Sequence, residues 1–526
     1  MSGSVVQGVA AEPDALSWPA QTLGQVLAGH ARQRGEDEAL VTDDVRLSYA
    51  QLLADARQAA AGLRALGLAR GDHVAIFMGN DARWVTLFYA AALLGCVTVP
   101  VNTRFKAGEL AFCLRQADCK AVFYAPRFLG IDFESMVREA APQCPLLEYI
   151  VSVERGLPAG TPDAALGADV CPDDPLLIQF TSGTTAYPKG VLLTHDNMLR
   201  NAWAAGIRMG VRAEDRYFNC RPFFHVGGST LSALVSLVFG ACLVTLPTFE
   251  AGAALRMMAQ ERCTLTSGND TIFQMLMGHP EFDPAALHLR GGWAAAGPQT
   301  VRRIIDVMGA KAICIAYGLS EASPNVVISD WRDPEPVRVE GLAKPHAGVE
   351  VRIQAADGRV CATGESGEIQ VRGWNVMRGY YNNPEQTAKT FTGDGWLRTG
   401  DLGTLDAEGR LRMVGRLKDV FRVGGENVAP AEVEEMLLAH PAVQTAQVVG
   451  VPDARLGEVA CAYVTLRSGG QATEEALVAW VKARCANFRV PRYLRIVDNF
   501  DAIGMTASGK VQKARLREHA IAEFKL

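Results

Sequence analysis

Short apolar segments alternate with segments of helical periodicity along most of this chain, and no other feature limits the possible folds as strongly. Apolar side chains recur at helical spacing over residues 49–66, Gly67 and Gly71 interrupt the pattern, and residues 73–78 form a short apolar segment typical of a strand. This alternation predicts an α/β fold with parallel sheets covered by helices. We expect a further helix at 82–94 and further strands at 96–101, 121–124, 176–180 and 313–317.

The C-terminal region shows a different order of elements. Residues 414–419 are polar and flanked by glycine, as in a hinge. Because 526 residues are too many for one ordinary core, we expect a large domain over residues 1–417 and a small α+β domain over residues 418–526, with the boundary near Lys418. In the small domain we expect a helix, two strands and a helix at residues 430–438, 446–451, 459–466 and 474–485.

Composition argues against several classes of protein. The formal net charge is −5 and the pI about 6.1, so the chain offers no electrostatic footprint for nucleic acid. The twelve cysteines include no pair at C-x-x-C spacing, which argues against a zinc site and a disulfide framework and favours free thiols in a reducing cytoplasm. Two uncharged stretches, 84–101 and 229–249, approach the length of a membrane span, but each is better interpreted as a short helix followed by a strand.

Residues 181–190, T-S-G-T-T-A-Y-P-K-G, form a loop between one predicted buried strand and another at 191–193. Its glycines allow backbone N–H groups to curl around an anion, its hydroxyls donate hydrogen bonds, and Lys189 supplies positive charge. The pattern indicates a phosphate-binding loop, although a solvated turn has a similar composition. Residues 504–511 almost match a Walker-type loop, but Val511 lacks the hydroxyl that would hold magnesium, so we reject that alternative.

The 181–190 segment resembles the phosphate-binding loop of the superfamily that contains acyl-CoA synthetases, adenylation domains and luciferase. Ala186 stands where that family usually has glycine. Residues 316–321, A-Y-G-L-S-E, resemble a second motif of the family, with Ser320 in place of threonine. The resemblance extends over residues 22–513, with five motifs in the order that the family shows.

The resemblance implies an ATP site. Tyr317 would lie along the adenine and Ser320 would contact phosphate. Glu321 would bind Mg²⁺ together with Thr184, since Mg²⁺ prefers hard oxygen ligands. Residues 367–401 resemble the next blocks of the family, in which Asp401 would accept both ribose hydroxyls. The nucleotide-binding residues implied in this way are Thr181, Ser182, Gly183, Thr184, Thr185, Lys189, Ala316, Tyr317, Gly318, Ser320, Glu321, Asp401, Arg416 and Lys510.

Two further motifs lie toward the C-terminus. Residues 415–419, G-R-L-K-D, resemble the hinge motif of the family, in which Arg416 would reach the ribose and Lys418 would form the hinge. Residues 506–510, T-A-S-G-K, resemble the last motif, which makes Lys510 the principal catalytic residue beside Lys189. Gly504 replaces a proline of the family, and a lysine in a loop is by itself most often a solvated charge.

The family joins a carboxylate to AMP with loss of pyrophosphate and then transfers the acyl group to a thiol. Cations stabilise the charge that develops on the phosphate oxygens, and we assign Mg²⁺, Lys189 and Lys510 to this role. The small domain of the family is mobile, and its rotation would remove Lys510 and bring Gly424 and Gly425 near the thiol of coenzyme A. From charge alone, Lys418 and Arg422 are candidates for steering the coenzyme A phosphates.

Residues 223–228, F-F-H-V-G-G, resemble a block of fatty-acyl and aryl coenzyme A ligases and lack the aspartate of amino-acid-activating domains. The resemblance suggests that His225 gates the acyl tunnel. Asn269 and Asp270 replace a small apolar residue and a proline. Either the acid carries a hydroxyl, keto or second polar group, or Asp270 bonds to the backbone and faces away. The expected acyl pocket consists of His225, Asn269, Asp270, Trp293, Ala296, Gly297 and Ala316.

These observations predict an ATP- and Mg²⁺-dependent acid–coenzyme A ligase that acts on a fatty-acyl or an aryl or alicyclic acid through an acyl-adenylate. An adenylation enzyme that passes the acyl group to a carrier protein or another acceptor is the alternative. A luciferase-like oxygenase and a non-catalytic nucleotide-binding protein are the rivals from other classes, and the latter predicts loss of Lys510 or Glu321, both of which are present. The oligomeric state stays open, a homodimer included.

Overall fold

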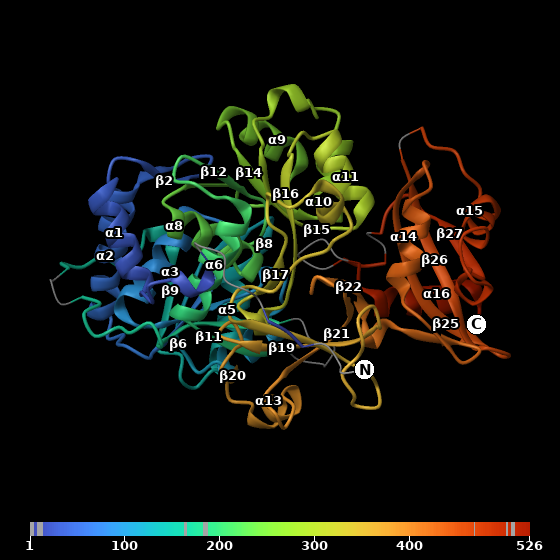
Figure 1. Cartoon of the computed structure of the whole chain (residues 1–526). Helices are drawn as coiled ribbons and strands as arrows, with labels where there is room; N and C mark the ends of the chain where they lie inside the picture. The colour runs from blue at the N-terminus through green and yellow to red at the C-terminus, as the bar shows by residue number, and fades with distance from the viewer. Residues whose placement is uncertain are drawn as a thin grey trace.

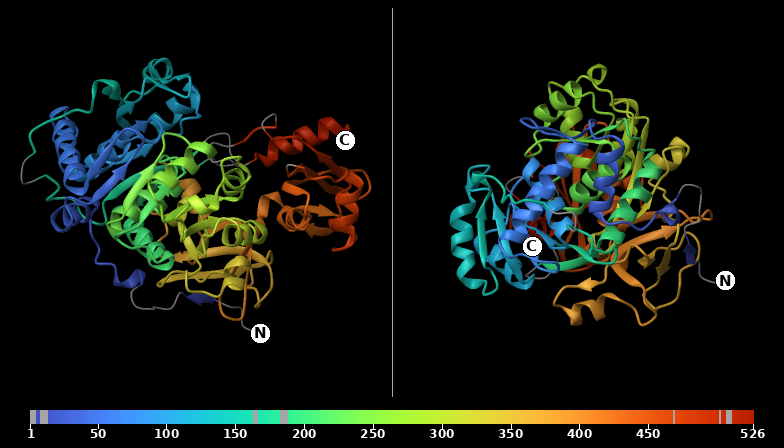
Figure 2. Two further views of the ribbon diagram at one scale, coloured as in Figure 1. Left: turned by 90° about the horizontal axis from the view of Figure 1, so that it is seen from above. Right: turned by 90° about the vertical axis from the view of Figure 1, so that its left-hand side faces the viewer.

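A computed structural model describes residues 5–7, 14–162, 166–181, 188–467, 469–500, 503–505 and 511–526 of the chain. The expected α/β class is confirmed, with a large N-terminal domain and a small C-terminal domain. Figure 1 shows the small domain, in deeper orange and red, beside the large domain, and the left view of Figure 2 shows the same arrangement from above. Most of the 181–190 loop and all of the 506–510 motif lie outside the described residues.

The first sheet of the large domain has seven strands. Its inner strands pair in parallel, as the alternation of strands and helices predicts, whereas β11 and β20 pair antiparallel at one edge. In spatial order the strands are β20 (Gly379–Tyr380), β11 (Lys189–Thr194), β10 (Pro175–Thr181), β5 (Val97–Pro100), β4 (His73–Phe77), β6 (Cys119–Tyr124) and β9 (Tyr149–Ser152).

The second sheet has eight strands, and six consecutive strands in it pair in parallel. Only the outermost strands, β17 and β3, run antiparallel to their neighbours. In spatial order the strands are β17 (Asn325–Ile328), β16 (Ala312–Gly318), β15 (Gly291–Ala295), β14 (Leu265–Asn269), β12 (Arg216–Asn219), β13 (Cys242–Thr245), β2 (Glu38–Val41) and β3 (Arg46–Ser48).

Helices connect these strands, and side chains of α2, α3 and α6 join those of both sheets in one core. The helix predicted over 49–66 is α2; the side chain of Ser48 caps its first turn, and Gly67, with φ of +98°, follows its end. The α-helices of the large domain are α1 (Leu23–Gln33), α2 (Tyr49–Ala65), α3 (Ala82–Leu94), α4 (Ala107–Gln116), α5 (Phe133–Ala140), α6 (His195–Met209), α7 (Val226–Gly228), α8 (Val235–Phe239), α9 (Ala251–Gln260), α10 (Asp270–Gly278), α11 (Pro298–Asp306), α12 (Glu335–Val339) and α13 (Pro384–Thr390).

Both long uncharged stretches fold as a helix followed by a strand, as expected. Residues 84–101 lie in α3 and β5, while residues 229–249 form a π-helical segment (Ser229–Leu234), α8 and β13. Across the ranges that the structure describes, no helix combines the length and the apolar character that crossing a bilayer requires.

A third, antiparallel sheet completes the large domain, and the alternating sequence pattern did not predict it. The last four of its strands follow one another closely along the chain with few helices between them, which favours antiparallel pairing. Its last strand, β22, continues through most of the segment interpreted as a hinge and ends at Arg416, where a 3₁₀ turn over Leu417–Asp419 begins. The strands are, in order, β1 (Val5–Gln7), β18 (Val349–Gln354), β19 (Gly367–Gly373), β21 (Leu397–Leu405) and β22 (Leu411–Arg416).

The small domain has its own hydrophobic core, built from one sheet and three helices. The helix predicted over 430–438 is α14, with Pro430 in its first turn, but the strand predicted over 446–451 is longer because it pairs with β26 along its whole length. The last predicted helix ends at Lys482, three residues earlier than 485. The elements are β23 (Phe421–Val423), β24 (Glu426–Val428), α14 (Pro430–Leu438), β25 (Val443–Asp453), β26 (Gly457–Leu466), α15 (Glu474–Lys482), β27 (Tyr493–Ile496) and α16 (Lys513–Phe524).

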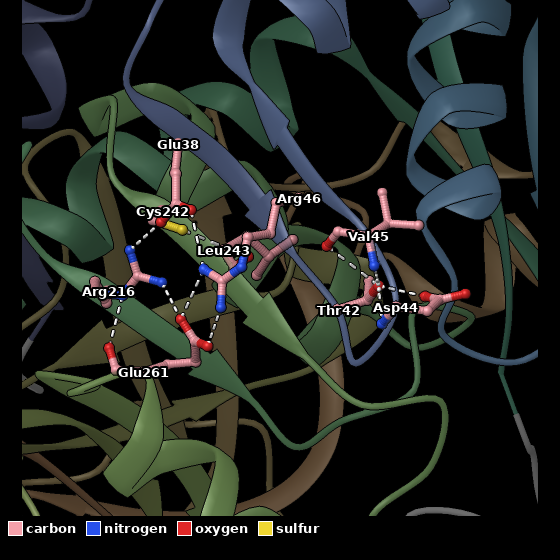
Figure 3. A network of polar contacts seen from close by, with 9 residues as sticks. All are labelled: Glu38, Thr42, Asp44, Val45, Arg46, Arg216, Cys242, Leu243 and Glu261. Atoms are coloured by element: carbon pink, nitrogen blue, oxygen red, sulfur yellow. Dashed lines mark hydrogen bonds and ion pairs between the residues drawn. The ribbon is translucent and has the colours of Figure 1, made fainter.

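A network of charged side chains fixes the outer edge of the second sheet, as Figure 3 shows. Glu261, which follows α9 and has only 5% of its side chain exposed, pairs with both Arg46 on β3 and Arg216 on β12. Glu38 on β2 pairs with the same two arginines, at 2.9 Å and 2.6 Å. Because each carboxylate bridges two guanidinium groups, the network holds the β2–β3 hairpin against the body of the sheet.

Candidate active site

Several residues that the sequence motifs singled out lie at one edge of the second sheet. Ala316 and Tyr317 lie near the end of β16, Asn269 is the last residue of β14, and Ala296 follows β15. These strands are parallel, so their carboxyl ends lie side by side. The carboxyl edge of a parallel sheet is where α/β proteins usually bind their ligands.

The two ends of the predicted phosphate loop face each other across a strand pair. Thr181 is the last residue of β10, Lys189 is the first residue of β11, and the two are direct partners in the antiparallel register. The loop is therefore anchored at both ends in the first sheet. Four of the predicted phosphate-binding residues lie outside the described residues, namely Ser182, Gly183, Thr184 and Thr185.

Tyr380 connects the phosphate-loop lysine with the predicted metal ligand. The Nζ atom of Lys189 lies 5.0 Å from the centre of the Tyr380 ring, and the Tyr380 hydroxyl donates a 2.8 Å hydrogen bond to Oε1 of Glu321. The backbone supports this arrangement, because β20 pairs with β11 and the N–H of Met377 donates to the Glu321 carbonyl. A lysine ammonium and a carboxylate from two motifs thus meet at the same aromatic ring.

Gly318, Ser320 and Glu321 follow the second sheet directly. Gly318 is the last residue of β16, and Ser320 begins a 3₁₀ turn that also contains Glu321. Gly318 leaves no room for a side chain, because a Cβ atom there would lie 2.0 Å from the carbonyl oxygen of Pro324. Ser320 and Glu321 are both half-buried, so their polar atoms remain accessible to a ligand.

Tyr317 and Asp401 are hydrogen-bonded to each other. The Tyr317 hydroxyl donates to Oδ2 of Asp401 over 2.9 Å, and Nε of Arg416 lies 3.6 Å from Oδ1 of the same carboxylate. Burial and the charge of Asp401 raise the pKa of Tyr317, so the phenol stays protonated and donates. Asp401 and Arg416 are direct partners on β21 and β22. The structure therefore brings together three residues that the motifs assign to the nucleoside.

The predicted acyl-pocket residues lie on neighbouring elements around the same edge. His225 precedes α7, and its Nδ1 accepts the backbone N–H of Gly227 at 3.0 Å. Trp293 on β15 and Ala316 on β16 are buried, with 4% and 9% of their surface exposed. Gly297 precedes α11, where a Cβ atom would meet no neighbour within 4 Å.

Asn269 and Asp270 form the start of α10. The side chain of Asn269 caps the helix by accepting the N–H of Ile272 at 3.0 Å. The carboxylate of Asp270 accepts the backbone N–H of Gly297 at 3.2 Å and 3.3 Å. Of the two sequence interpretations of Asp270, the structure shows the bond to the backbone, and this bond ties α10 to the turn before α11.

The predicted coenzyme A residues lie in the small domain and at its start. Gly424 and Gly425 form the two-residue turn between β23 and β24, with φ of +58° and +97°, values that suit glycine at both positions. Arg422 precedes this turn and donates from Nε to Asn427. Lys418 is exposed in the 3₁₀ turn after β22. Lys510 lies outside the described residues.

Sequence reasoning missed two side chains at this edge. Tyr380 lies within residues 367–401, which resemble a family block, but nothing in the local pattern indicates that its hydroxyl reaches Glu321. Arg221 belongs to none of the motifs, although a charge directly before the apolar residues 222–224 is a signal for a functional side chain. Arg221 is buried and lies over the ring of Trp293, 4.7 Å from its centre.

Comparison with known proteins identifies the same superfamily as the sequence motifs. The sequence profile of the AMP-binding enzyme family matches residues 27–381, and the profile of the AMP-binding enzyme C-terminal domain matches residues 432–510. YngI of Bacillus subtilis (strain 168), which carries the name of an acyl-CoA synthetase, is 36% identical over 96% of this chain and 98% of its own length. The mitochondrial medium-chain acyl-CoA ligase ACSF2 of Rattus norvegicus is 34% identical over 96% of this chain and 88% of its own length.

A solved structure agrees with the sequence relatives. The crystal structure of the anthranilate CoA ligase AuaEII in complex with anthranoyl-AMP superimposes with a TM-score of 0.87 at 25% identity, covering 97% of this chain and 100% of that one. The likeness thus includes both domains and extends over nearly the whole chain. The chain therefore belongs to the AMP-binding enzymes, the adenylate-forming superfamily that its motifs indicate, and is an AMP-forming acid–CoA ligase.

Proposed function

We propose that this enzyme activates a carboxylic acid, of the fatty-acyl or the aryl or alicyclic class, by forming an acyl-adenylate from ATP and then transferring the acyl group to coenzyme A. The observation that carries the proposal is the contact of Tyr380 with both Lys189 and Glu321. It joins a cation of the phosphate loop to a carboxylate that can bind a metal ion. An arrangement of this kind suits the triphosphate of ATP.

The residues at this position fit Mg²⁺. Among the residues that the structure describes, no group of three or more histidine, cysteine, aspartate and glutamate side chains could hold a metal ion. A single hard carboxylate suits an ion that keeps most of its ligands from phosphate and water, and Glu321 is such a carboxylate, with Thr184 as the second proposed ligand. Bound there, Mg²⁺ would neutralise charge on the phosphate oxygens.

Adenylation needs the acid carboxylate to attack the α-phosphorus in line while pyrophosphate leaves. In this proposal Asp401 accepts the ribose hydroxyls, with Tyr317 and Arg416 holding its carboxylate in place. Lys189 binds the phosphates at the loop, and Lys510 stabilises the negative charge that develops at the reacting phosphate. The two lysines act on negative charge that grows in the transition state, so they lower the barrier to adenylation as well as bind ATP.

For the second step we propose that the small domain rotates about Lys418. The 3₁₀ turn of Leu417–Asp419 directly after β22 is a suitable pivot, because Leu417 and Lys418 are exposed in it. Rotation would exchange Lys510 for the Gly424–Gly425 turn, where the absence of side chains leaves space for a thiol to approach. The twelve cysteines are free thiols, which suits the reducing cytoplasm that we propose as the location.

The test is AMP release by the purified protein with ATP, Mg²⁺ and a panel of short, medium, long, aromatic and oxygenated acids, with and without coenzyme A. We expect turnover to require both an acid and coenzyme A. Lys510→Ala should lower the rate of adenylation at least about 100-fold, as expected for loss of a transition-state cation. Acid-dependent pyrophosphate exchange without coenzyme A-dependent turnover would contradict the proposal and indicate another acceptor, such as a carrier protein.

A further inference from the structure

Arg221 is a buried arginine that has no anionic partner among the described residues. Only 5% of its surface is exposed, and its Nε has no hydrogen-bond partner among the described residues. The titratable groups that act on it there are the thiol of Cys220 and the phenol of Tyr217, whose pKa values are raised by burial so that both are neutral, and burial lowers the pKa of Arg221. An uncompensated guanidinium in a protein interior is strongly unfavourable, so its retention calls for a ligand that supplies the missing charge.

The backbone of Arg221 is held rigidly. The amide of Asn219 both accepts the N–H of Arg221 at 3.2 Å and donates to its carbonyl at 2.8 Å. Asn80, from the loop after β4, donates to the same carbonyl at 2.9 Å. Thr245 accepts from both amides, at 3.2 Å and 3.3 Å, and orients them. The backbone that carries the guanidinium is therefore fixed before any ligand binds, and this reduces the entropy that binding must overcome.

Three more buried hydrogen-bond donors lie at this position, and none of them carries a charge. They are the hydroxyl of Tyr217, the hydroxyl of Ser267 and the indole N–H of Trp293. Ser267 and Trp293 are direct partners on β14 and β15, and Tyr217 lies on the adjoining β12, so all three side chains point to the same face of the sheet. Each of these groups can donate a hydrogen bond, but none of them supplies the negative charge that would neutralise Arg221.

Arg221 adjoins the predicted acyl pocket. The guanidinium of Arg221 lies over Trp293, an acyl-pocket residue, and its Cδ would lie 2.8 Å from a Cβ atom on Gly227. Gly227 belongs to the turn after His225, which the family resemblance places at the acyl tunnel. A side chain at position 227 would therefore clash with Arg221. Glycine at this position leaves room for the arginine side chain.

We propose that Arg221 binds a second carboxylate of the acid substrate, so that the enzyme activates one end of a dicarboxylic acid while the other end binds to Arg221 beside Trp293. The inference rests on the proposed function, because it assumes that the acyl pocket lies at this edge of the sheet. A hydroxyl or keto group would accept the same hydrogen bonds but leave the positive charge of Arg221 uncompensated. A carboxylate supplies both the hydrogen-bond acceptors and the compensating negative charge. Arginine also matches the planar geometry of a carboxylate.

The test compares α,ω-dicarboxylic acids of graded length, together with aromatic dicarboxylic acids, against monocarboxylic acids of equal length, by kcat/KM for coenzyme A-dependent AMP release. The variants are Arg221→Met and Arg221→Lys. Arg352→Met is the matched control, because Arg352 also lies buried over a tryptophan, 4.4 Å from the Trp396 ring centre, but is neutralised by Asp394 at 2.7 Å in the third sheet.

We expect the wild type to prefer a dicarboxylic acid by about 10- to 100-fold, the range that charge-assisted hydrogen bonds produce. Arg221→Met should abolish or invert the preference, Arg221→Lys should keep part of it, and Arg352→Met should leave the ranking unchanged. A purely structural role would lower the rates with all acids equally. If Arg221→Met does not fold, the ranking of dicarboxylic against monocarboxylic acids by the wild type tests the proposal by itself.

Two results overturn the inference and differ from each other. A wild type that releases AMP with monocarboxylic acids at least as well as with their dicarboxylic counterparts excludes the second carboxylate while leaving the acid–coenzyme A ligase intact. A ranking that Arg221→Met does not alter excludes Arg221 as its cause. If no acid of either panel supports AMP release, the proposed function fails first, and the inference fails with it.

Discussion

The hydroxyl of Tyr317 donates a 2.9 Å hydrogen bond to Asp401 and so joins the end of β16 in the second sheet to β21 in the third sheet. Arg416 lies 3.6 Å from the other oxygen of the same carboxylate. Before ATP arrives, the group proposed to bind the ribose is thus already oriented from two sides. Preorganisation of this kind reduces the entropy that binding must overcome.

Asp401→Asn tests this role. The substitution keeps the size of the side chain but removes the charge and one of the two acceptor oxygens, so the KM for ATP should rise about 10- to 100-fold, as for loss of hydrogen bonds to a charged group. Tyr317→Phe is the control, since it leaves the carboxylate in place and should change KM by about 5-fold or less. If the Asp401→Asn enzyme kept the wild-type KM for ATP, Asp401 would not be the group that binds the ribose.

Glu321→Gln tests the proposed metal ligand. Glutamine still accepts the hydrogen bond of Tyr380, but it lacks the charge that Mg²⁺ requires, so AMP release should fall about 100-fold or more and the Mg²⁺ concentration for half-maximal rate should rise. Tyr380→Phe removes only the hydrogen bond and should cost about 5-fold. Equal losses in the two variants, with the same Mg²⁺ dependence, would assign Glu321 a structural role instead.

Asp270 should make stability depend on pH. Burial, with a contribution from the Glu434 carboxylate, raises the pKa of Asp270 from 3.8 to about 6, against the opposing hydrogen bonds from Thr300 and Gly297. Because the folded state keeps this proton to higher pH than the unfolded state, the free energy of unfolding falls as pH rises from about 4 to about 6 and stays lower above that range.

Asp270→Asn removes this dependence while keeping an acceptor for the N–H of Gly297. At pH 8 the midpoint of thermal unfolding should rise by about 2 °C or more relative to the wild type, and near pH 4 the difference should vanish. Asp283→Asn is a suitable control, because the exposed Asp283 also accepts a backbone N–H, from Ala285. An equal shift at both pH values would contradict the raised pKa as its cause.

Glu261→Gln should destabilise the large domain without altering the reaction. The substitution leaves Arg46 and Arg216 without their most buried partner, which should lower the free energy of unfolding by about 2–4 kcal/mol. Glu38→Gln, at a side chain that is 37% exposed, should cost less than about 1 kcal/mol. Thermal unfolding and AMP release per folded molecule measure the two effects, and equal destabilisation by both variants would refute the view that burial decides the difference.

The sequence predicted single elements and motif residues well. Helix α14 spans the predicted residues 430–438, and the 229–249 stretch folds as helical turns followed by β13, because local periodicity and turn residues determine such elements. The antiparallel sheet of β1, β18, β19, β21 and β22 was not foreseen. Its strands carry no signal for their partners, since the pairing of strands depends on the rest of the chain.

By itself, the sequence determined the superfamily and the kinds of chemical group at the site, because motif residues stand at fixed separations that the chain cannot alter. Only the tertiary structure decided which groups meet. Tyr380 reaches Glu321, and Arg221 lies over Trp293 with no carboxylate beside it in the part of the chain that the structure describes, because strands far apart in the sequence lie side by side in the two larger sheets. Hydrogen bonds and ion pairs act over a few ångströms, so their partners are set by packing and not by distance along the chain.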